Sequence, residues 1–315
     1  MTVEEIVADA ESAHRDGAWP VHPADGAVTP DEARTLYLGA AGMLWALRRL
    51  GSTLEVELEP LDQPTPSLLV GESGILLVTR ADDERLQALV DANERNAAWE
   101  LLWGSAGTIL AAKHAGLEWR RSAEILADEW GRSGGLWTQT IGGKQAQYLG
   151  AAHGFAANVH ALRGLVDDDV LRRRIEPVLR EHAVWHGDAV NWPPIPGMDA
   201  DRVQWCHGAP GIVATLGDLL PEDLLLAAAE TTWRTGPLAK GQGLCHGTAG
   251  NGFALLKTWS VTGDGRWLDR ARVFADAALA QCDGRYSLFT GDVGAALLAR
   301  ACDARDPRFP ILDVA

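Results

Sequence analysis

Two short stretches of this 315-residue sequence carry residues that could bind a metal. Each contains a Cys-His-Gly triplet at the start of a Gly-x-x-Gly turn, once at Cys206-His207 and again at Cys245-His246. Thirty-nine residues separate the cysteines, so they are two copies of one unit and not a local Cys-x-x-Cys knuckle. Thiolates with an imidazole suit Zn²⁺, and a catalytic zinc commonly keeps three protein ligands and one open position. The pattern predicts a zinc site, with His207 and His246 equivalent candidates for the third ligand.

An apolar segment follows each cysteine turn. If that segment is a helix, its N-terminus presents unpaired N–H groups and partial positive charge, which favour the thiolate form of a nearby cysteine. The alternative is that both are buried, unreactive cysteines behind tight turns. Because the Cys-His-Gly triplet is duplicated, we favour the metal site over this alternative.

The composition excludes several classes of protein. With 28 Lys+Arg against 43 Asp+Glu, the formal net charge is −15, which would repel nucleic acid. No apolar run reaches the ~18 residues of a membrane span, and the acidic first residues do not resemble a signal peptide. Four cysteines are too few for a disulfide scaffold, which leaves Cys282 and Cys302 as single thiols. We therefore expect a cytoplasmic protein.

The Gly-x-x-Gly turn followed by a Leu/Ala-rich segment occurs seven times along the chain, at intervals of 32 to 54 residues. The cysteine motifs are its fifth and sixth copies. The fourth copy is degenerate, because Ala157 stands where the second glycine is expected. A motif that recurs on this scale predicts a repeat architecture. The first glycines of the seven turns are Gly39, Gly71, Gly104, Gly154, Gly208, Gly247 and Gly291.

The segments after the turns are apolar all round, which predicts buried helices. The stretches between turns carry charge on one face, which predicts amphipathic helices outside them. Helical pairs that rotate from one to the next can close into a ring and so lose the exposed ends of an open solenoid. We therefore predict an all-α fold, a ring of helical pairs, in one domain over residues 1–315. The clearest amphipathic stretches are residues 84–90, 121–130, 170–182, 222–233 and 268–281.

Three stretches do not fit this helical repeat. Residues 53–58 alternate like a strand, but the run ends at Pro60 and is expected to be a connector. Residues 131–147 precede the fourth turn, and residues 182–203 precede the first cysteine turn. Loops of this length often line binding sites, although both could equally be surface connectors.

The motifs resemble those of the lanthionine synthetase C-like family, which includes peptide cyclases and free-standing relatives. The resemblance spans nearly the whole chain and is closer to the free-standing relatives. It implies an α/α toroid of seven inner and seven outer helices with one Zn²⁺ at its mouth. The matching strings are Tyr37-Leu38-Gly39 with Gly42, Glu100-Leu101-Leu102-Trp103-Gly104, Tyr148-Leu149-Gly150-Ala151-Ala152-His153-Gly154, Trp205-Cys206-His207-Gly208-Ala209-Pro210-Gly211, Leu244-Cys245-His246-Gly247 with Gly250-Asn251, and Tyr286-Ser287-Leu288-Phe289.

The resemblance also assigns the residues of the metal site. It implies that Cys206, Cys245 and His246 are the zinc ligands, a choice that the spacing alone leaves open. His207 stands where the cyclases carry a tyrosine, which is the pattern of the free-standing relatives.

Three further positions match catalytic positions of the family. His153 falls on the acid/base histidine. Arg202 falls where the cyclases carry an active-site arginine, although a loop salt bridge is an equal alternative. Glu100 stands where the cyclases carry an aspartate, so its role is open. By this reading His153 is the proton donor, and Arg202 or His207 stabilises an enolate.

The implied reaction is the zinc-dependent addition of a thiol to dehydroalanine or dehydrobutyrine, which forms a thioether. The partners are a peptide or protein that contains the dehydroamino acid, a thiol from a peptide cysteine or glutathione, and a dehydratase as a candidate companion. A non-catalytic protein that binds zinc and a peptide or glutathione is the main alternative. A glycan-processing (α/α) barrel is disfavoured, because that class uses paired carboxylates and these turns offer cysteines and histidines.

Overall fold

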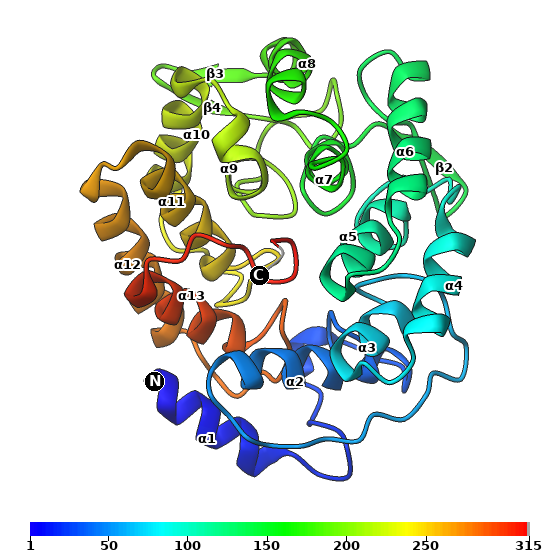
Figure 1. Ribbon diagram of the computed structural model, residues 1–315. Coiled ribbons are helices and arrows are strands. Elements are labelled where there is room, and N and C mark those ends of the chain that lie inside the picture. The colour runs from blue at the N-terminus through cyan, green and yellow to red at the C-terminus, as the bar shows by residue number, and fades with distance from the viewer. Residues whose placement is uncertain (314–315) are drawn as a thin grey trace.

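The computed structural model describes residues 1–313, which form thirteen α-helices and two short β-hairpins. Seven of these helices begin at the Gly-x-x-Gly turns. Figure 1 shows that they surround a central axis. The all-α ring predicted from the repeat is confirmed. In residues 1–313, none of the helices has the length and apolar character needed to cross a membrane. The inner helices are α2 (Ala40–Arg49), α3 (Glu72–Thr79), α5 (Ser105–Ala115), α7 (Phe155–Ala161), α9 (Ala209–Leu216), α11 (Thr248–Thr262) and α13 (Asp292–Ala304).

Backbone hydrogen bonds join the turns of neighbouring inner helices. The Tyr37 N–H donates to the Leu69 carbonyl at 2.8 Å, which joins the first and second turns. The Phe289 N–H donates to the Tyr37 carbonyl at 3.3 Å, and the Cys245 N–H donates to the Phe289 carbonyl at 2.8 Å. Since the seventh turn bonds to the first, the ring is closed.

The second glycine of each turn allows a neighbouring turn of the ring to approach closely. A Cβ at Gly42 would lie 2.2 Å from the Leu36 carbonyl oxygen and 2.9 Å from the Leu288 side chain of the seventh turn. A Cβ at Gly250 would lie 3.0 Å from the Trp205 side chain of the fifth turn. The repeated glycines are therefore required by the packing of turn against turn.

Replacing Gly74 by alanine is expected to destabilise the fold by about 2 to 3 kcal/mol, because the new methyl group overfills a packed site. Its Cβ would lie 2.1 Å from the Leu68 carbonyl oxygen and 2.9 Å from the Leu36 side chain. Gly131→Ala is the control, since Gly131 lies inside a helix and a Cβ there meets nothing within 4 Å. Chemical denaturation measures the unfolding midpoint of each variant. A midpoint of Gly74→Ala equal to that of the wild type would contradict the packing role.

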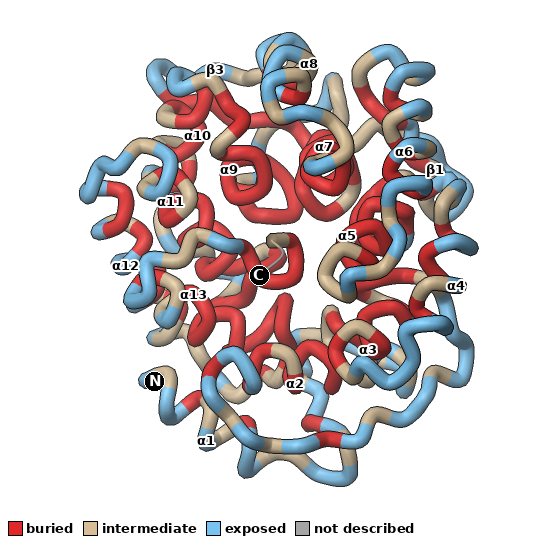
Figure 2. Tube along the Cα trace, in the orientation of Figure 1, coloured by how far each residue is buried: buried red, intermediate tan, exposed pale blue. Residues whose placement is uncertain are grey.

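The outer helices cover the buried inner ring with amphipathic faces, and Figure 2 shows burial concentrated on the inner ring. All five predicted amphipathic stretches are helical. The segment between α2 and α3 contains no helix, as expected for a connector, so residues 1–313 contain six outer helices instead of the seven that the resemblance implies. The six are α1 (Val3–Ala13), α4 (Asp83–Asn93), α6 (Arg120–Arg132), α8 (Asp168–Glu181), α10 (Glu222–Thr235) and α12 (Gly265–Ala280).

The two long insertions each contain an antiparallel hairpin, β1 (Gln139–Ile141) with β2 (Lys144–Ala146) and β3 (Val184–His186) with β4 (Ala189–Asn191). Both hairpins brace turns of the ring: the Gln139 side chain accepts the Tyr148 N–H at 2.9 Å, and Asn191 accepts the Ala209 N–H at 2.7 Å. Three short 3-10 helices complete the fold, η1 (Pro23–Asp25), η2 (Glu32–Arg34) and η3 (Gly217–Leu219).

The C-terminal segment, red in Figure 1, crosses the centre of the ring. Two histidines near the C-terminal ends of inner helices hold it: His114 Nε2 lies 2.8 Å from the Ile311 carbonyl oxygen, and His160 Nε2 lies 3.1 Å from that of Leu312. Burial lowers the pKa of both histidines, so each neutral ring can donate to its carbonyl. Phe309 stacks on Trp205 with ring centroids 4.8 Å apart, so this segment packs directly behind the first cysteine turn.

Replacing Asp218 by asparagine is expected to destabilise the fold by about 1 to 2 kcal/mol at neutral pH. Its carboxylate lies 2.7 Å from Arg163 Nη2 and 3.3 Å from Lys257 Nζ. Burial alone would raise the pKa of Asp218, but Lys257 and Arg163 lower it to about 2. The folded-state pKa is below the unfolded value, so the stabilisation is present above that unfolded value and is lost as the pH falls through about 2.

Urea denaturation of wild type and Asp218→Asn over a range of pH tests this prediction. The difference in stability should shrink as the pH falls toward the folded pKa. Asp188→Asn is the control, because Asp188 pairs with Arg234 on the surface with its side chain 75% exposed. A pH-independent difference would show that the charge of Asp218 is not responsible.

Candidate active site

The fold places the two cysteine turns side by side. The Cys206 N–H donates to the Cys245 carbonyl at 3.0 Å, so the two turns are neighbours in the ring despite their distance in sequence. The first cysteine turn is tight: Gln204 and His207 exchange backbone hydrogen bonds of 3.1 and 3.0 Å around Cys206. Gly208 follows with φ of +101°, a conformation that favours glycine. Helices α9 and α11 begin directly after the two turns, so both N-termini face the cysteines.

Cys206 and Cys245 are both buried, each 6% exposed. The adjacent Cys245 thiol is the largest cause that lowers the pKa of Cys206. The pKa of Cys245 is raised, first by the adjacent Cys206 and then by burial. The two thiols therefore lie close enough for each to shift the pKa of the other.

The donors around this pair fit a thiolate-preferring metal in kind. Metal ions bind cysteine as the thiolate, so a metal bound here would displace the thiol protons of both cysteines. Burial, followed by the charges of Lys240 and Arg285, lowers the pKa of His246, so its ring is neutral and able to act as a ligand. Within residues 1–313, however, no three His, Cys, Asp or Glu side chains are preassembled as a metal-binding cluster.

His153 is paired with Glu100. His153 Nδ1 lies 3.2 Å from Glu100 Oε2, and the Glu100 carboxylate is fully buried whereas the His153 side chain is 23% exposed. The carboxylate also accepts the N–H groups of Leu102 at 2.9 Å and of Gly104 at 3.0 Å. Because a buried carboxylate accepts a proton-bearing nitrogen, Nδ1 carries the hydrogen and Nε2 is left to exchange a proton with a substrate.

His207 lies against His153, with ring centroids 5.6 Å apart. Burial lowers the pKa of His207 to about 4, and the charges of His153, Arg202 and Lys240 contribute. His207 is therefore neutral near neutral pH and can donate a hydrogen bond but not act as an imidazolium acid. Arg202 lies on the exposed loop before Cys206, close enough to influence His207, and within residues 1–313 its guanidinium makes no ion pair.

Two aromatic side chains border His153. The exposed Trp103 stacks on its ring with centroids 5.6 Å apart, and Tyr148 lies 5.7 Å from His153 and 6.0 Å from His207. These aromatic rings line one side of the site from the surface to His207, the residue beside Cys206.

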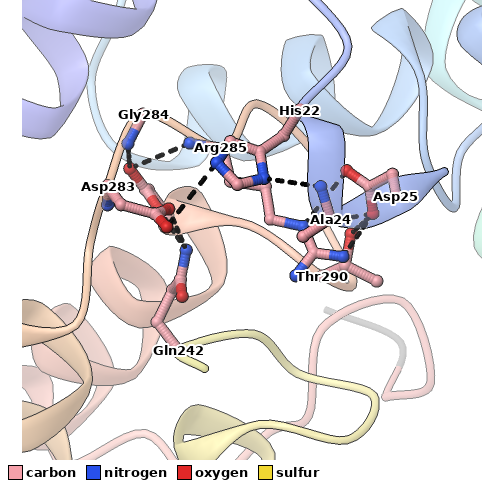
Figure 3. Close-up of polar contacts among 9 residues, drawn as sticks. His22, Ala24, Asp25, Gln242, Asp283, Gly284, Arg285 and Thr290 are labelled. Atoms are coloured by element: carbon pink, nitrogen blue, oxygen red, sulfur yellow. Dashed lines mark hydrogen bonds and ion pairs between the residues drawn. The ribbon is translucent and has the colours of Figure 1, made fainter. Parts of the chain in front are cut away.

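A buried ion pair lies within electrostatic reach of His246 and joins the N-terminal segment to the seventh turn (Figure 3). Arg285 Nε lies 3.1 Å from each carboxylate oxygen of Asp25. On the same side of the ring, Gln242 donates to the Asp283 carboxylate at 3.2 Å. These contacts fix the second cysteine turn against its neighbour.

The structure thus brings Cys206 and Cys245 together, and separately His153 and His207, while Arg202 stays at the rim. Sequence reasoning left the role of Glu100 open and missed the polar side chains that contact the sulfurs. The Gln204 Nε2 group donates to Cys206 Sγ at 2.9 Å. Burial, followed by the nearby Cys245, raises the pKa of Tyr37. An amide two residues before a cysteine is a signal that could have identified Gln204.

A closed ring of inner and outer helices with a thiol pair at its turns defines the class of α/α toroids with a sulfur site. A family model described as lanthionine synthetase C-like protein matches residues 22–313, and the chain belongs to this family. The chain is similar to glutathione S-transferase LANCL1 of Danio rerio, 33% identical over 190 residues, which are 54% of this chain and 47% of that protein. It is also similar to LanC-like protein GCL1 of Arabidopsis thaliana, 30% identical over 171 residues, 47% of this chain and 39% of that protein. The match spans less than half the length of each relative.

Proposed function

We propose that this protein is an enzyme that adds a thiol to a dehydroalanine or dehydrobutyrine residue of a peptide or protein and forms a thioether. The observation that carries the proposal is the position of the Cys206–Cys245 pair and the Glu100–His153 pair at the same end of the ring, close enough for His153 to lower the pKa of Cys206. Membership of the lanthionine synthetase C-like family supports it. The name of the Danio rerio relative supports glutathione as a thiol donor.

Cys206, Cys245 and His246 would hold Zn²⁺ in this proposal. His246 is preferred to His207 because the His207 ring packs against His153 and Tyr148, on the side of the proton donor. Bound there, Zn²⁺ would supply a position at which a substrate thiol loses its proton and stays a thiolate at neutral pH.

The remaining chemistry uses side chains of the chain. As the thiolate sulfur forms its bond to the β-carbon, the π electrons of the C=C bond move onto the carbonyl oxygen as an enolate. His153, protonated on both ring nitrogens, then donates its Nε2 proton to the α-carbon while Glu100 holds its Nδ1–H. The substrate thiol releases its own proton to solvent and His153 regains one from solvent, so no proton is gained or lost overall. The neutral His207 can donate a hydrogen bond to the enolate oxygen, and the cationic Arg202 adds favourable charge nearby.

Mass spectrometry of the zinc-loaded protein with glutathione and a dehydroalanine peptide tests the proposal. The expected product is the peptide plus one glutathione, formed faster than in the mixture without protein. A peptide that carries both a cysteine and a dehydroalanine tests intramolecular closure, which is seen as loss of the free thiol at constant mass. No acceleration with either substrate in zinc-loaded protein would overturn the enzyme and favour a non-catalytic binding protein.

A further inference from the structure

We propose that Gln204 and Tyr37 are positioning residues that donate one hydrogen bond to each of the two sulfurs and so set the negative charge that the sulfurs offer to a metal. The proposal deepens the proposed function and rests on its metal centre. Its geometric basis is the Gln204 Nε2 group, which donates to Cys206 Sγ at 2.9 Å, together with the backbone bonds that join Phe289 to both Tyr37 and Cys245.

The orientation of the Gln204 amide is fixed by Lys240. Lys240 Nζ lies 2.9 Å from Gln204 Oε1, and an ammonium group can only donate hydrogen bonds. The amide oxygen therefore faces Lys240, and the amide N–H faces Cys206. Gln204 is buried, and its backbone bonds to His207 close the same turn that carries Cys206. Donor and sulfur are thus parts of one rigid turn.

Tyr37 reaches Cys245 from the first turn of the ring. Its ring stacks on Phe289 with centroids 5.1 Å apart and planes 11° apart, and its backbone bonds to the turns on both sides. A phenol has an ordinary pKa of about 10, so the Tyr37 hydroxyl keeps its proton at neutral pH. A protonated phenol beside a sulfur that is about to become a thiolate is a hydrogen-bond donor.

Each donor stabilises the thiolate form of its sulfur and fixes the direction of the sulfur lone pairs. Groups that act in this way on metal ligands typically change metal affinity by about 10- to 100-fold. The two donors come from different elements, so they can be removed separately. Lys240 holds the amide of Gln204, and its charge also reaches Cys206.

Titration of the metal-free, full-length protein with Co²⁺ against a competing chelator tests the inference, with cobalt–thiolate absorption as the readout. Gln204→Glu keeps the shape of the side chain, but its carboxylate would pair with Lys240 and present an acceptor and negative charge to the sulfur. We expect it to weaken Co²⁺ binding about tenfold or more and to shift the absorption band. Gln204→Met, which lacks both donor and charge, is the second variant if the first does not fold. Tyr37→Phe should weaken binding about tenfold.

Two controls match these changes. Tyr286→Phe removes a hydroxyl that donates to Asp9 at 2.8 Å, and Gln147→Glu changes an amide that bonds to Thr138 on the surface. Both should bind Co²⁺ like the wild type. Absence of cobalt–thiolate absorption in the wild type would overturn the metal centre, and with it the proposed function. Normal binding and an unshifted band in both the Gln204 variants and Tyr37→Phe would overturn only the donor roles.

Discussion

Zinc content is expected to fall from about one ion per chain to near zero when Cys245 is replaced by alanine. The change removes one of the two sulfurs and leaves Cys206 in a buried site with a single thiolate. Structural zinc sites bind with roughly 10 to 16 kcal/mol from four ligands, so the loss of one ligand should weaken binding about a hundredfold or more. Metal analysis after dialysis, together with thioether formation from glutathione, measures the two consequences.

The backbone role of Cys245 survives this substitution, which makes the result specific for sulfur. The Cys206 N–H still finds the carbonyl of residue 245, and the N–H of residue 245 still donates to Phe289. Cys282→Ala is the matched control, because that thiol is half-buried and donates to the Ala278 carbonyl at 3.4 Å, away from the two cysteine turns. Cys282→Ala should keep its zinc and activity. Undiminished zinc in Cys245→Ala would place the metal elsewhere or remove it from the mechanism.

The ring was predictable because each turn repeats the same steric requirement. Gly42, Gly74 and Gly250 all stand where a Cβ would collide with a carbonyl oxygen of their own turn and a side chain of the preceding turn in the ring. Because this steric requirement recurs at fixed positions of each motif, glycine recurs at those positions along the sequence. The amphipathic outer helices also leave a periodic pattern, because their buried side must face the inner ring.

Structural features that occur only once leave no repeated pattern in the sequence and were not predictable. The hairpins β1–β2 and β3–β4 occupy insertions that occur once each, and their hydrogen bonds to the ring depend on single side chains such as Asn191. The C-terminal segment that fills the ring is held by carbonyl oxygens of Ile311 and Leu312, which any residue could supply. Backbone acceptors carry no sequence signal.

The residues of the candidate site likewise divide into those that the sequence predicts and those that it does not. The two cysteines were predictable because the Cys-His-Gly triplet is duplicated, and their contact follows from the adjacency of the fifth and sixth turns. Glu100 contacts His153 of another turn, and Gln204 contacts Cys206 through a single short hydrogen bond. For Glu100 the available signal was an acidic residue inside the apolar string before Trp103, since a buried carboxylate requires donors.

All seven inner helices begin at the same end of the ring, each with the first glycine of its turn as N-cap. The positive ends of their dipoles therefore face the sulfurs, where negative charge is needed. The opposite ends carry cations: Arg48 and Arg49 close α2, and Lys113 Nζ donates to the Ala161 carbonyl at 2.8 Å at the end of α7. The ring architecture and the proposed thiolate chemistry thus favour the same end of the molecule.

Replacing His153 by asparagine is expected to lower the turnover number for thioether formation by about 10²- to 10⁴-fold while leaving zinc content unchanged. Asparagine keeps an amide N–H that can donate to Glu100, but it cannot pass a proton to the α-carbon. His153 is not one of the proposed ligands, so the thiol should still bind and ionise. Steady-state kinetics with a dehydroalanine peptide, alongside metal analysis, separate the two effects.

Glu100→Gln tests how His153 is oriented. The amide keeps the size of the side chain but removes the charge that accepts the His153 Nδ1–H, so turnover should fall less than in His153→Asn, again with zinc retained. His186→Asn, a change at an exposed histidine of β3, is the control and should be as active as the wild type. If His153→Asn turns over normally, the α-carbon takes its proton from water or another group, and the Glu100–His153 pair serves only to hold the fourth turn against the third. A loss of zinc in His153→Asn would instead make this histidine part of the metal centre, because a proton donor can be removed without disturbing the ligands and a ligand cannot.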